Sequence, residues 1–221
     1  MQEEFHQELI KQYFNKSKDF ILMKQLLFQS YSFRRKSIMG NSKLFVDLLT
    51  EFPYLEQQAL REDEFSTIVE MKVAKVVESI GKIFKQLWSY YGINSNNVIL
   101  GSIEVIKRLE KDTKVKNKKA ESLFFSRKNL DLNQVAAPRI FVQQNNFSVV
   151  YKTTILSKIE NDLNSESIIL NLYSFYFIYD LKYPEVFSQV LNLFHSILFP
   201  FEECNFDKNT NMLKIIDYLK Q

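Results

Sequence analysis

The sequence predicts a mainly α-helical, multi-helix globular domain with one small β-hairpin near residues 139–153. Apolar residues recur at three- and four-residue steps along most of the chain, as they do on the buried face of a helix. Glycine and proline number only four each among 221 residues, which leaves few of the breaks that an all-β fold needs. Two runs rich in β-branched and aromatic residues, 139–143 and 147–153, flank a short polar stretch and are typical of a hairpin.

Helices are expected to fill most of the chain before residue 110. Apolar side chains at helical spacing predict helices over residues 3–29, 43–52, 62–91 and 97–109. Gly40 and Asn41 indicate a turn between the first two helices, and Ser42 is the candidate N-cap of the second. Pro53 is expected to end that helix, because proline cannot continue the helical hydrogen-bond ladder. Gly92 follows the longest apolar stripe, where a glycine commonly ends a helix.

The most apolar part of the chain runs from residue 172 to residue 200. Three charged residues interrupt it: Asp180, Lys182 and Glu185. Pro184 disfavours helical backbone at the residue before it, so the uninterrupted part is too short to cross a membrane. We therefore expect a buried helix, an amphipathic helix and a short C-terminal helix, over residues 168–179, 185–199 and 209–219. No membrane partner is expected.

The chain is expected to be organised in three segments that share one core. The first, 1–110, is the N-terminal helical part. The second, 107–137, is a basic segment with a connecting loop. The third, 138–221, holds the hairpin and the C-terminal helices.

Positive charge is concentrated in one place, between residues 107 and 128. This stretch has nine basic residues and three acidic ones, whereas the whole chain has a net charge of only +3. The nine are candidate nucleic-acid contacts: Lys107, Arg108, Lys111, Lys114, Lys116, Lys118, Lys119, Arg127 and Lys128. Lysine-rich surfaces bind phosphates without reading bases, and Phe124 and Phe125 are candidates for base stacking.

Other readings of the basic segment stay open. A solvated loop or a nuclear-import signal has the same composition. A smaller cluster, Arg34, Arg35 and Lys36, would extend the basic surface if the fold brings it near.

No motif in the sequence predicts catalysis. The two histidines, His6 and His195, are each expected to lie partly exposed on a polar helix face without a metal-binding partner. Glu202 and Glu203 precede Cys204 and would raise its thiol pKa, which disfavours a nucleophilic dyad with His195. The glycines form no phosphate-binding pattern. The acidic run 62–64 is explained by an expected place at a helix start. We predict no enzyme, no catalytic or metal residue and no cofactor.

Three stretches together resemble a known protein family. They are SYSFRRKSIMGNSKLFVDLLTEFPYLEQQALREDEF, PRIFVQ and LYSFYFIYDLKYPEVFSQVLNLFHSILF. In this order they are similar to the C-terminal region of the multi-copy family labelled sterile alpha motif domain-containing protein 3-like, over roughly residues 30–203. The resemblance implies an interaction role and no enzymatic one. The sterile alpha motif itself is not visible in this chain, so oligomerisation through that motif is not carried over.

The function predicted from the sequence is therefore a non-enzymatic interaction or structural domain that binds proteins. The alternative is a nucleic-acid-binding protein that uses the basic segment. Packing in the core explains most of the excess of Phe and Tyr. An interaction role predicts that some of these residues form an exposed aromatic patch, with self-association or a protein partner. The single cysteine is typical of a reducing compartment, so we expect an intracellular protein, cytoplasmic or nuclear.

Overall fold

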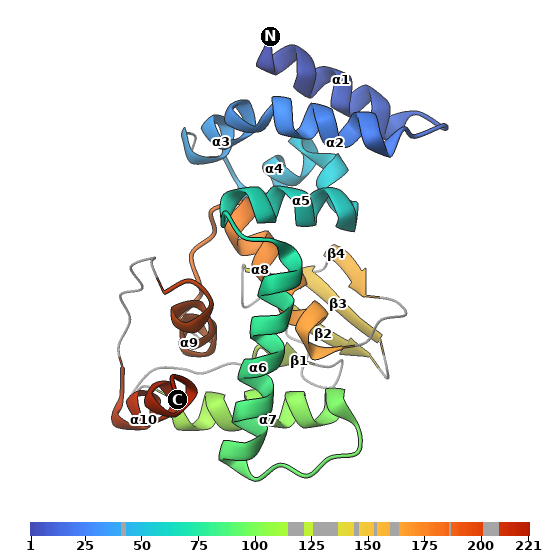
Figure 1. The fold of residues 1–221 in the computed structure, drawn as a ribbon. Coiled ribbons are helices and arrows are strands. Elements are labelled where there is room, and N and C mark those ends of the chain that lie inside the picture. The colour runs from blue at the N-terminus through green and yellow to red at the C-terminus, as the bar shows by residue number, and fades with distance from the viewer. Residues whose placement is uncertain are drawn as a thin grey trace. The chain divides into compact units, whose positions relative to one another are not determined.

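The computed structural model describes residues 1–40, 43–114, 122–125, 137–143, 146–152, 154–159, 164–185, 187–200 and 208–221. Within these ranges the chain is mainly helical and carries a small sheet, which confirms the predicted fold class (Figure 1). The chain divides into two compact units. The first unit holds Met1–Val73 and Ser174–Leu181, and the second holds Ala74–Tyr173 and Lys182–Gln221. None of the described helices is long and apolar enough to span a membrane.

The first unit is built from short helices. They are α1 (Gln2–Phe14), α2 (Phe20–Gln29), α3 (Tyr31–Gly40), α4 (Phe45–Glu51), the 3-10 turn η1 (Pro53–Glu56) and α5 (Gln58–Ile68). Helices α1 and α2 lie side by side, and α2 also packs on α5 (Figure 1). The core between them is apolar and fully enclosed, with Leu9, Met23, Phe52, Leu60 and Phe65 inaccessible to solvent.

Two predictions for this unit need correction. The segment 3–29 is two helices, because Asp19 starts a new one: its carboxylate accepts hydrogen bonds from the amides of Ile21 and Leu22, both at 3.0 Å. Residues 31–40, expected to lead into a turn, form α3. Helix α4 has Leu44 at its N-cap, and Asn41 and Ser42 lie outside the described residues. Pro53 ends α4 as predicted.

The predicted helix over residues 62–91 is also two helices, α5 and α6 (Val73–Tyr91). The break is a left-handed residue, Glu70, with φ of 53°. The amide of Met71 bonds to the carbonyl of Ser66 at 3.2 Å, the pattern that commonly closes a helix. Glycine is the usual residue at such a position. Because a glutamate stands there, the break could not be predicted from the sequence.

The second unit holds most of α6 together with four further helices. They are α7 (Val98–Asp112), α8 (Ser165–Ile178), α9 (Ser188–Leu198) and α10 (Thr210–Leu219). Gly92 ends α6 in the left-handed conformation, as predicted, with φ of 59°. Gly101 lets α7 approach the indole of Trp88, because a Cβ at that position would lie 2.1 Å from the indole Cζ2.

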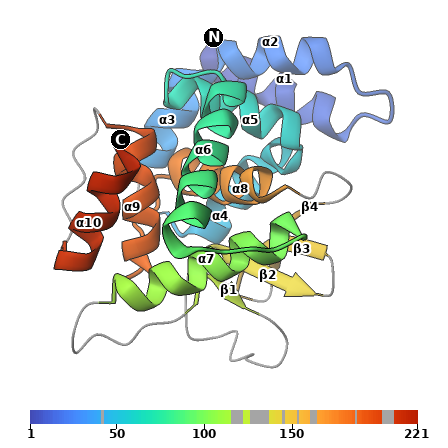
Figure 2. The same ribbon diagram turned by 60° about the horizontal axis from the view of Figure 1, so that its bottom comes forward.

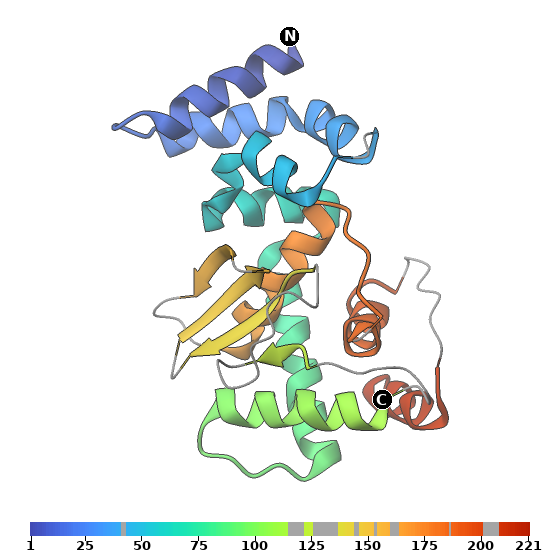
Figure 3. The same ribbon diagram turned by 180° about the vertical axis from the view of Figure 1, so that it is seen from behind.

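The predicted hairpin is present in the second unit. Strands β2 (Arg139–Gln143) and β3 (Asn146–Tyr151) pair antiparallel, with Phe141 opposite Ser148. Two strands that were not predicted extend it into a four-stranded sheet of order β1-β2-β3-β4 (Figure 2). They are β1 (Phe124–Phe125), parallel to β2, and β4 (Thr154–Ile159), antiparallel to β3. Figure 3 shows the three longer strands side by side from behind.

The three C-terminal helices appear where the sequence predicts them. Helix α8 is buried along nearly its whole length, with Ile169, Leu172 and Phe175 almost inaccessible. Its residues up to Tyr173 belong to the second unit, and those from Ser174 on belong to the first. Helix α9 is amphipathic, and Asn209 caps α10 by accepting a hydrogen bond from the Met212 amide at 2.8 Å. These three helices thus agree with the apolar periodicity of the sequence.

Candidate interaction surface

The α1–α2 hairpin places several large apolar side chains in solvent. The inner face of α2 packs Met23, Leu26 and Leu27 into the first unit. The opposite face leaves Ile21 and Phe28 exposed to 74% and 75%, and Phe14 at the end of α1 is 70% exposed. With Phe20, which is 43% exposed, these residues form a set that we call the outer stripe. Helix α2 is thus apolar on both faces, whereas a helix with one face in solvent is normally polar on that face.

Exposed apolar residues in the second unit are more scattered. They are Tyr90 on α6, Val98 and Leu100 on α7, Ile155 on β4 and Leu213 on α10. Single exposed apolar residues are ordinary on protein surfaces, whereas a group of them on one element is typical of a binding site. The outer stripe is such a group, because its four members lie within fifteen residues of one hairpin.

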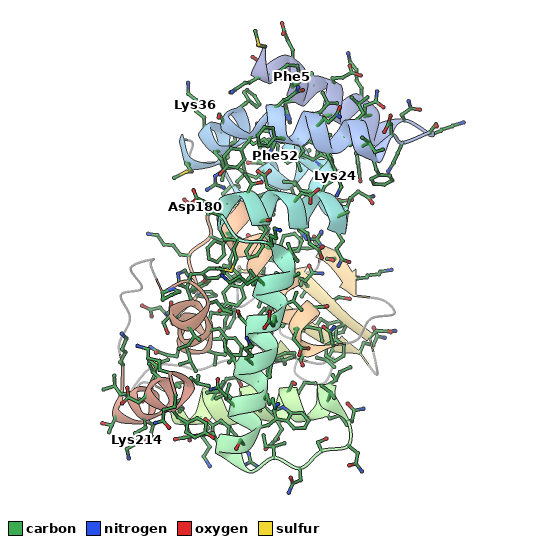
Figure 4. The ribbon with its side chains drawn as sticks, viewed as in Figure 1. Phe5, Lys24, Lys36, Phe52, Asp180 and Lys214 are labelled. Carbon is green, nitrogen blue, oxygen red and sulfur yellow. The ribbon has the colours of Figure 1, made fainter. Side chains whose placement is uncertain are left out.

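Lysines surround the outer stripe. Lys16 and Lys18 lie in the link between α1 and α2, both exposed, and neither forms an ion pair with a residue that the structure describes. The Lys18 ammonium lies 4.4 Å from the centroid of the Tyr13 ring. Lys24 lies on α2 (Figure 4) and pairs with Asp63 of α5 at 2.8 Å. The stripe is therefore apolar with a positive end.

A pocket of about 270 Å³ opens beside Phe28. Its walls come from α2, α3 and α5, and its lining residues are Lys24, Leu27, Phe28, Tyr31, Arg34, Asp63, Glu64, Ser66 and Thr67. The lining charges form two ion pairs, Lys24 with Asp63 and Arg34 with Glu64. Because the two pairs cancel, the pocket adds no net charge to the surface.

The floor of this pocket is a buried polar network. The Arg34 guanidinium pairs with the Glu64 carboxylate through two nitrogens and donates to the Ser30 hydroxyl at 2.6 Å. Both partners of the ion pair are inaccessible to solvent. A bidentate ion pair of this kind fixes α3 against α5 and so holds the pocket walls in place.

His6 also lies inside the first unit, which corrects the expectation of a partly exposed histidine. Its exposure is 2%, and its Nδ1 lies 3.1 Å from the Tyr54 hydroxyl. Burial, and then the positive charge of Arg34, lower the His6 pKa from 6.5 to about 4. Burial raises the Tyr54 pKa. The imidazole is therefore neutral near pH 7 and acts as a packing and hydrogen-bonding group.

The second histidine is half-buried in the second unit. Its Nδ1 lies 2.8 Å from the hydroxyl of Tyr183, and its ring meets the rings of Tyr183 and Phe199 edge-on. Cys204, Glu202 and Glu203 lie outside the described residues. Among the residues that are described, no group of three or more His, Cys, Asp or Glu side chains has the arrangement of a metal site.

The structure describes only part of the predicted basic segment. Lys107, Arg108 and Lys111 lie exposed on α7, and Lys114 follows its end. Arg108 is engaged, since its Nε pairs with Glu104 at 2.9 Å and its guanidinium donates to the Tyr91 carbonyl at 2.8 Å. The remaining five candidates lie outside the described ranges: Lys116, Lys118, Lys119, Arg127 and Lys128. Lys107 and Lys111 are four residues apart and follow one side of α7, whereas Lys114 lies beyond the end of this helix.

Phe124 is not available for base stacking. It is 8% exposed and belongs to β1. The side chain of Phe125 lies outside the described part of the chain. Burial of Phe124 thus removes one of the two aromatic rings expected to accompany the basic segment.

The smaller basic cluster does not form a surface of its own. Arg34 is buried in the ion pair with Glu64, and Arg35 donates a hydrogen bond to the carbonyl of Ile178 at 2.7 Å. Of the three, only Lys36 on α3 is exposed (Figure 4). Two of the three charges are therefore structural.

The acidic run 62–64 also has a different place from the one expected. Because α5 begins at Gln58, these residues lie in the middle of the helix and not at its start. Glu62 accepts a hydrogen bond from the Gln58 amide, Asp63 pairs with Lys24 and Glu64 pairs with Arg34. Each carboxylate has a structural partner.

The comparisons with known proteins add no assignment. No protein-family model, no curated protein and no solved structure matches this chain. The resemblance to the sterile alpha motif domain-containing protein 3-like family stays a prediction from the sequence.

Ile21 and Phe14 are among the apolar residues from which one helix over residues 3–29 was predicted. The exposure of Ile21 follows from the break at Asp19, which turns α2 relative to the periodicity counted from residue 3. Phe14 precedes this break and is exposed at the end of α1. A usable signal was present in the letters FILMKQLLF, which put apolar residues on every side of the helix. The pair of Arg34 and Glu64 had no such signal, because the two residues stand thirty positions apart.

Proposed function

We propose that this chain is a non-enzymatic protein-interaction domain and that the outer stripe is its binding surface. The observation that carries the proposal is the exposure of Phe14, Ile21 and Phe28 on one helical hairpin. Large aromatic and aliphatic side chains of this kind supply most of the binding energy of protein interfaces. Leaving them in water costs free energy that a partner recovers.

The size of the stripe fits a modest affinity. Burying one large apolar side chain is worth about 2 kcal/mol. Three such side chains give about 6 kcal/mol, from which the loss of translational freedom on binding has to be subtracted. Micromolar affinity corresponds to about 8 kcal/mol, so a partner of that affinity must also bury surface beyond these three side chains, at the pocket and around the lysines.

The test compares the wild-type chain with a double variant, Ile21→Ser with Phe28→Ser. Nuclease-treated extract from the native source is passed over each protein, and self-association is measured by sedimentation velocity. We expect the wild type to capture a protein or to associate with itself at micromolar concentration, and the double variant to lose this at least tenfold. Leu213→Ser on α10 is the matched control, since Leu213 is 46% exposed outside the stripe.

Circular dichroism of the variants shows whether the fold is kept. A wild-type chain that stays strictly monomeric and captures no protein would contradict the proposal. Equal capture by the double variant would contradict it as well.

A second function, nucleic-acid binding, is favoured by one observation. Lys107 and Lys111 are exposed on one side of α7, and Lys114 is exposed just beyond its end. Each phosphate contact makes the affinity depend more steeply on salt, by about 0.9 in the log–log slope for duplex DNA.

The test of this second function is a gel shift over a range of salt concentrations. Lys107→Glu with Lys111→Glu is expected to weaken binding and to lower the salt slope, whereas Lys214→Glu on α10 leaves both unchanged. Absent binding, or binding that salt does not affect, rules this function out.

A further inference from the structure

The outer stripe has the geometry of a helix-binding face. Ile21, Gln25 and Phe28 follow one another at four- and three-residue steps, so they lie on one side of α2 over about two turns, or roughly 10 Å. Phe14 adds an aromatic ring from the neighbouring helix. A partner helix presents apolar side chains at the same steps, so the two faces match in period.

The charges around the stripe select among such helices. Residues 11–28 contain four lysines and one aspartate. Two of the lysines already form ion pairs, Lys11 with Glu8 at 3.3 Å and Lys24 with Asp63 at 2.8 Å. The aspartate of this stretch is Asp19, whose carboxylate is engaged with two backbone amides at the start of α2. Lys16 and Lys18 keep their charges in solvent next to Phe14 and Phe20. A partner with carboxylates beside its apolar face would neutralise these lysines, and a basic partner would be repelled.

The middle of the stripe does not oppose such a partner. Lys24 stands between Ile21 and Phe28, and its charge is compensated by Asp63. A bound helix would thus cover a complete ion pair and no unpaired charge at this point. The uncompensated charge is confined to the Lys16 and Lys18 end.

We propose that the outer stripe binds an acidic amphipathic helix of a partner protein. The apolar face of this helix covers Phe14, Ile21 and Phe28, and its carboxylates pair with Lys16 and Lys18. This inference rests on the proposed function, because it names the chemistry of the partner for the same surface.

The experiment uses two synthetic amphipathic helical peptides with one shared leucine face. One peptide has glutamate at its polar positions and the other has lysine, and fluorescence anisotropy measures the binding of each to the full chain. We expect the glutamate peptide to bind at least tenfold more tightly. Ile21→Ser with Phe28→Ser should lose this binding at least tenfold. Lys16→Glu with Lys18→Glu should reverse the preference between the peptides.

A matched control and two competitors complete the experiment. Leu213→Ser with Lys214→Glu changes one apolar and one basic residue on α10 and should leave both affinities as they are. Phosphatidylserine vesicles and a single-stranded oligonucleotide are added as competitors, because they also carry negative charge.

Four results would overturn the inference. The first is equal affinity for the two peptides, and the second is a Lys16→Glu, Lys18→Glu variant that behaves as wild type. The third is tighter binding of the stripe to vesicles or oligonucleotide than to the glutamate peptide. The fourth is self-association that the Ile21→Ser, Phe28→Ser variant abolishes, since a second copy would then cover the stripe.

The failure of this inference can be told from failure of the proposed function. If protein capture from extract needs Ile21 and Phe28 but is unaffected by charge reversal at Lys16 and Lys18, the interaction domain stands and the acidic partner does not.

Discussion

Acidification should destabilise the first unit through His6. The imidazole is packed among the rings of Phe33, Phe52 and Tyr54, at centroid distances of 5.1, 5.4 and 5.9 Å. Burial and the charges of Arg34 and Lys43 lower its pKa to about 4, against an opposing effect of Glu51. The unfolded chain has no such environment, so His6 titrates there near its ordinary pKa of 6.5.

The sign and size follow from proton binding. Between pH 6.5 and pH 4 the unfolded state binds the His6 proton and the folded state does not, so the free energy of unfolding falls as the pH falls. Each pH unit within this window is worth about 1.4 kcal/mol, which gives a loss of about 2 kcal/mol on going from pH 7.5 to pH 5. Above pH 6.5 the histidine is neutral in both states and contributes no pH dependence.

The assay is urea unfolding at pH 7.5 and pH 5, followed by circular dichroism, with wild type and His6→Asn. Asparagine places an amide near the Tyr54 hydroxyl but does not titrate. We expect the variant to be less stable at pH 7.5, because it packs less well, and the difference to shrink by about 2 kcal/mol at pH 5. His195 is present in both proteins, so any contribution that it makes cancels in the difference.

Nuclear magnetic resonance gives a second, direct measurement of the His6 pKa. A His6 resonance that titrates near pH 6.5, or a stability difference between the two proteins that is the same at both pH values, would refute this reasoning.

The remaining predictions concern packing and backbone. Arg34→Met leaves the Glu64 carboxylate buried without its partner and should lower the free energy of unfolding in urea by about 3–5 kcal/mol. Adding Glu64→Leu should restore part of this stability. A loss below about 1 kcal/mol in Arg34→Met would contradict the buried ion pair. Gly101→Ala drives a methyl group into the Trp88 ring and should cost roughly 1–3 kcal/mol and shift the indole fluorescence, whereas unchanged fluorescence and stability would contradict the close approach. Asp180 follows the end of α8 with φ of 50°. In thermal or urea unfolding, Asp180→Gly should raise the free energy of unfolding by roughly 0.5–1 kcal/mol and Asp180→Val should lower it. The opposite order would show that the left-handed backbone carries no strain.

The candidate site was predictable only in part. The sequence indicated that most aromatic residues pack in the core and that an interaction role would leave some of them exposed as a partner surface. It did not indicate where this surface lies, because the break at Asp19 decides which side of α2 faces solvent. The basic residues of α7 were predicted as exposed and are exposed, whereas Arg34 and Phe124 were expected at a surface and are buried.

Local pattern was enough for most helices and for the hairpin, because apolar periodicity and turn residues act over a few neighbouring positions. The burial of α8, the glycine end of α6 and the cap at Asn209 are of this kind. The division of residues 62–91 at Glu70 and the ion pair between Arg34 and Glu64 are not. Only the tertiary structure shows them. Glu70 adopts a left-handed backbone that its residue type does not signal, and the partner that allows the Arg34 charge to be buried lies on another helix.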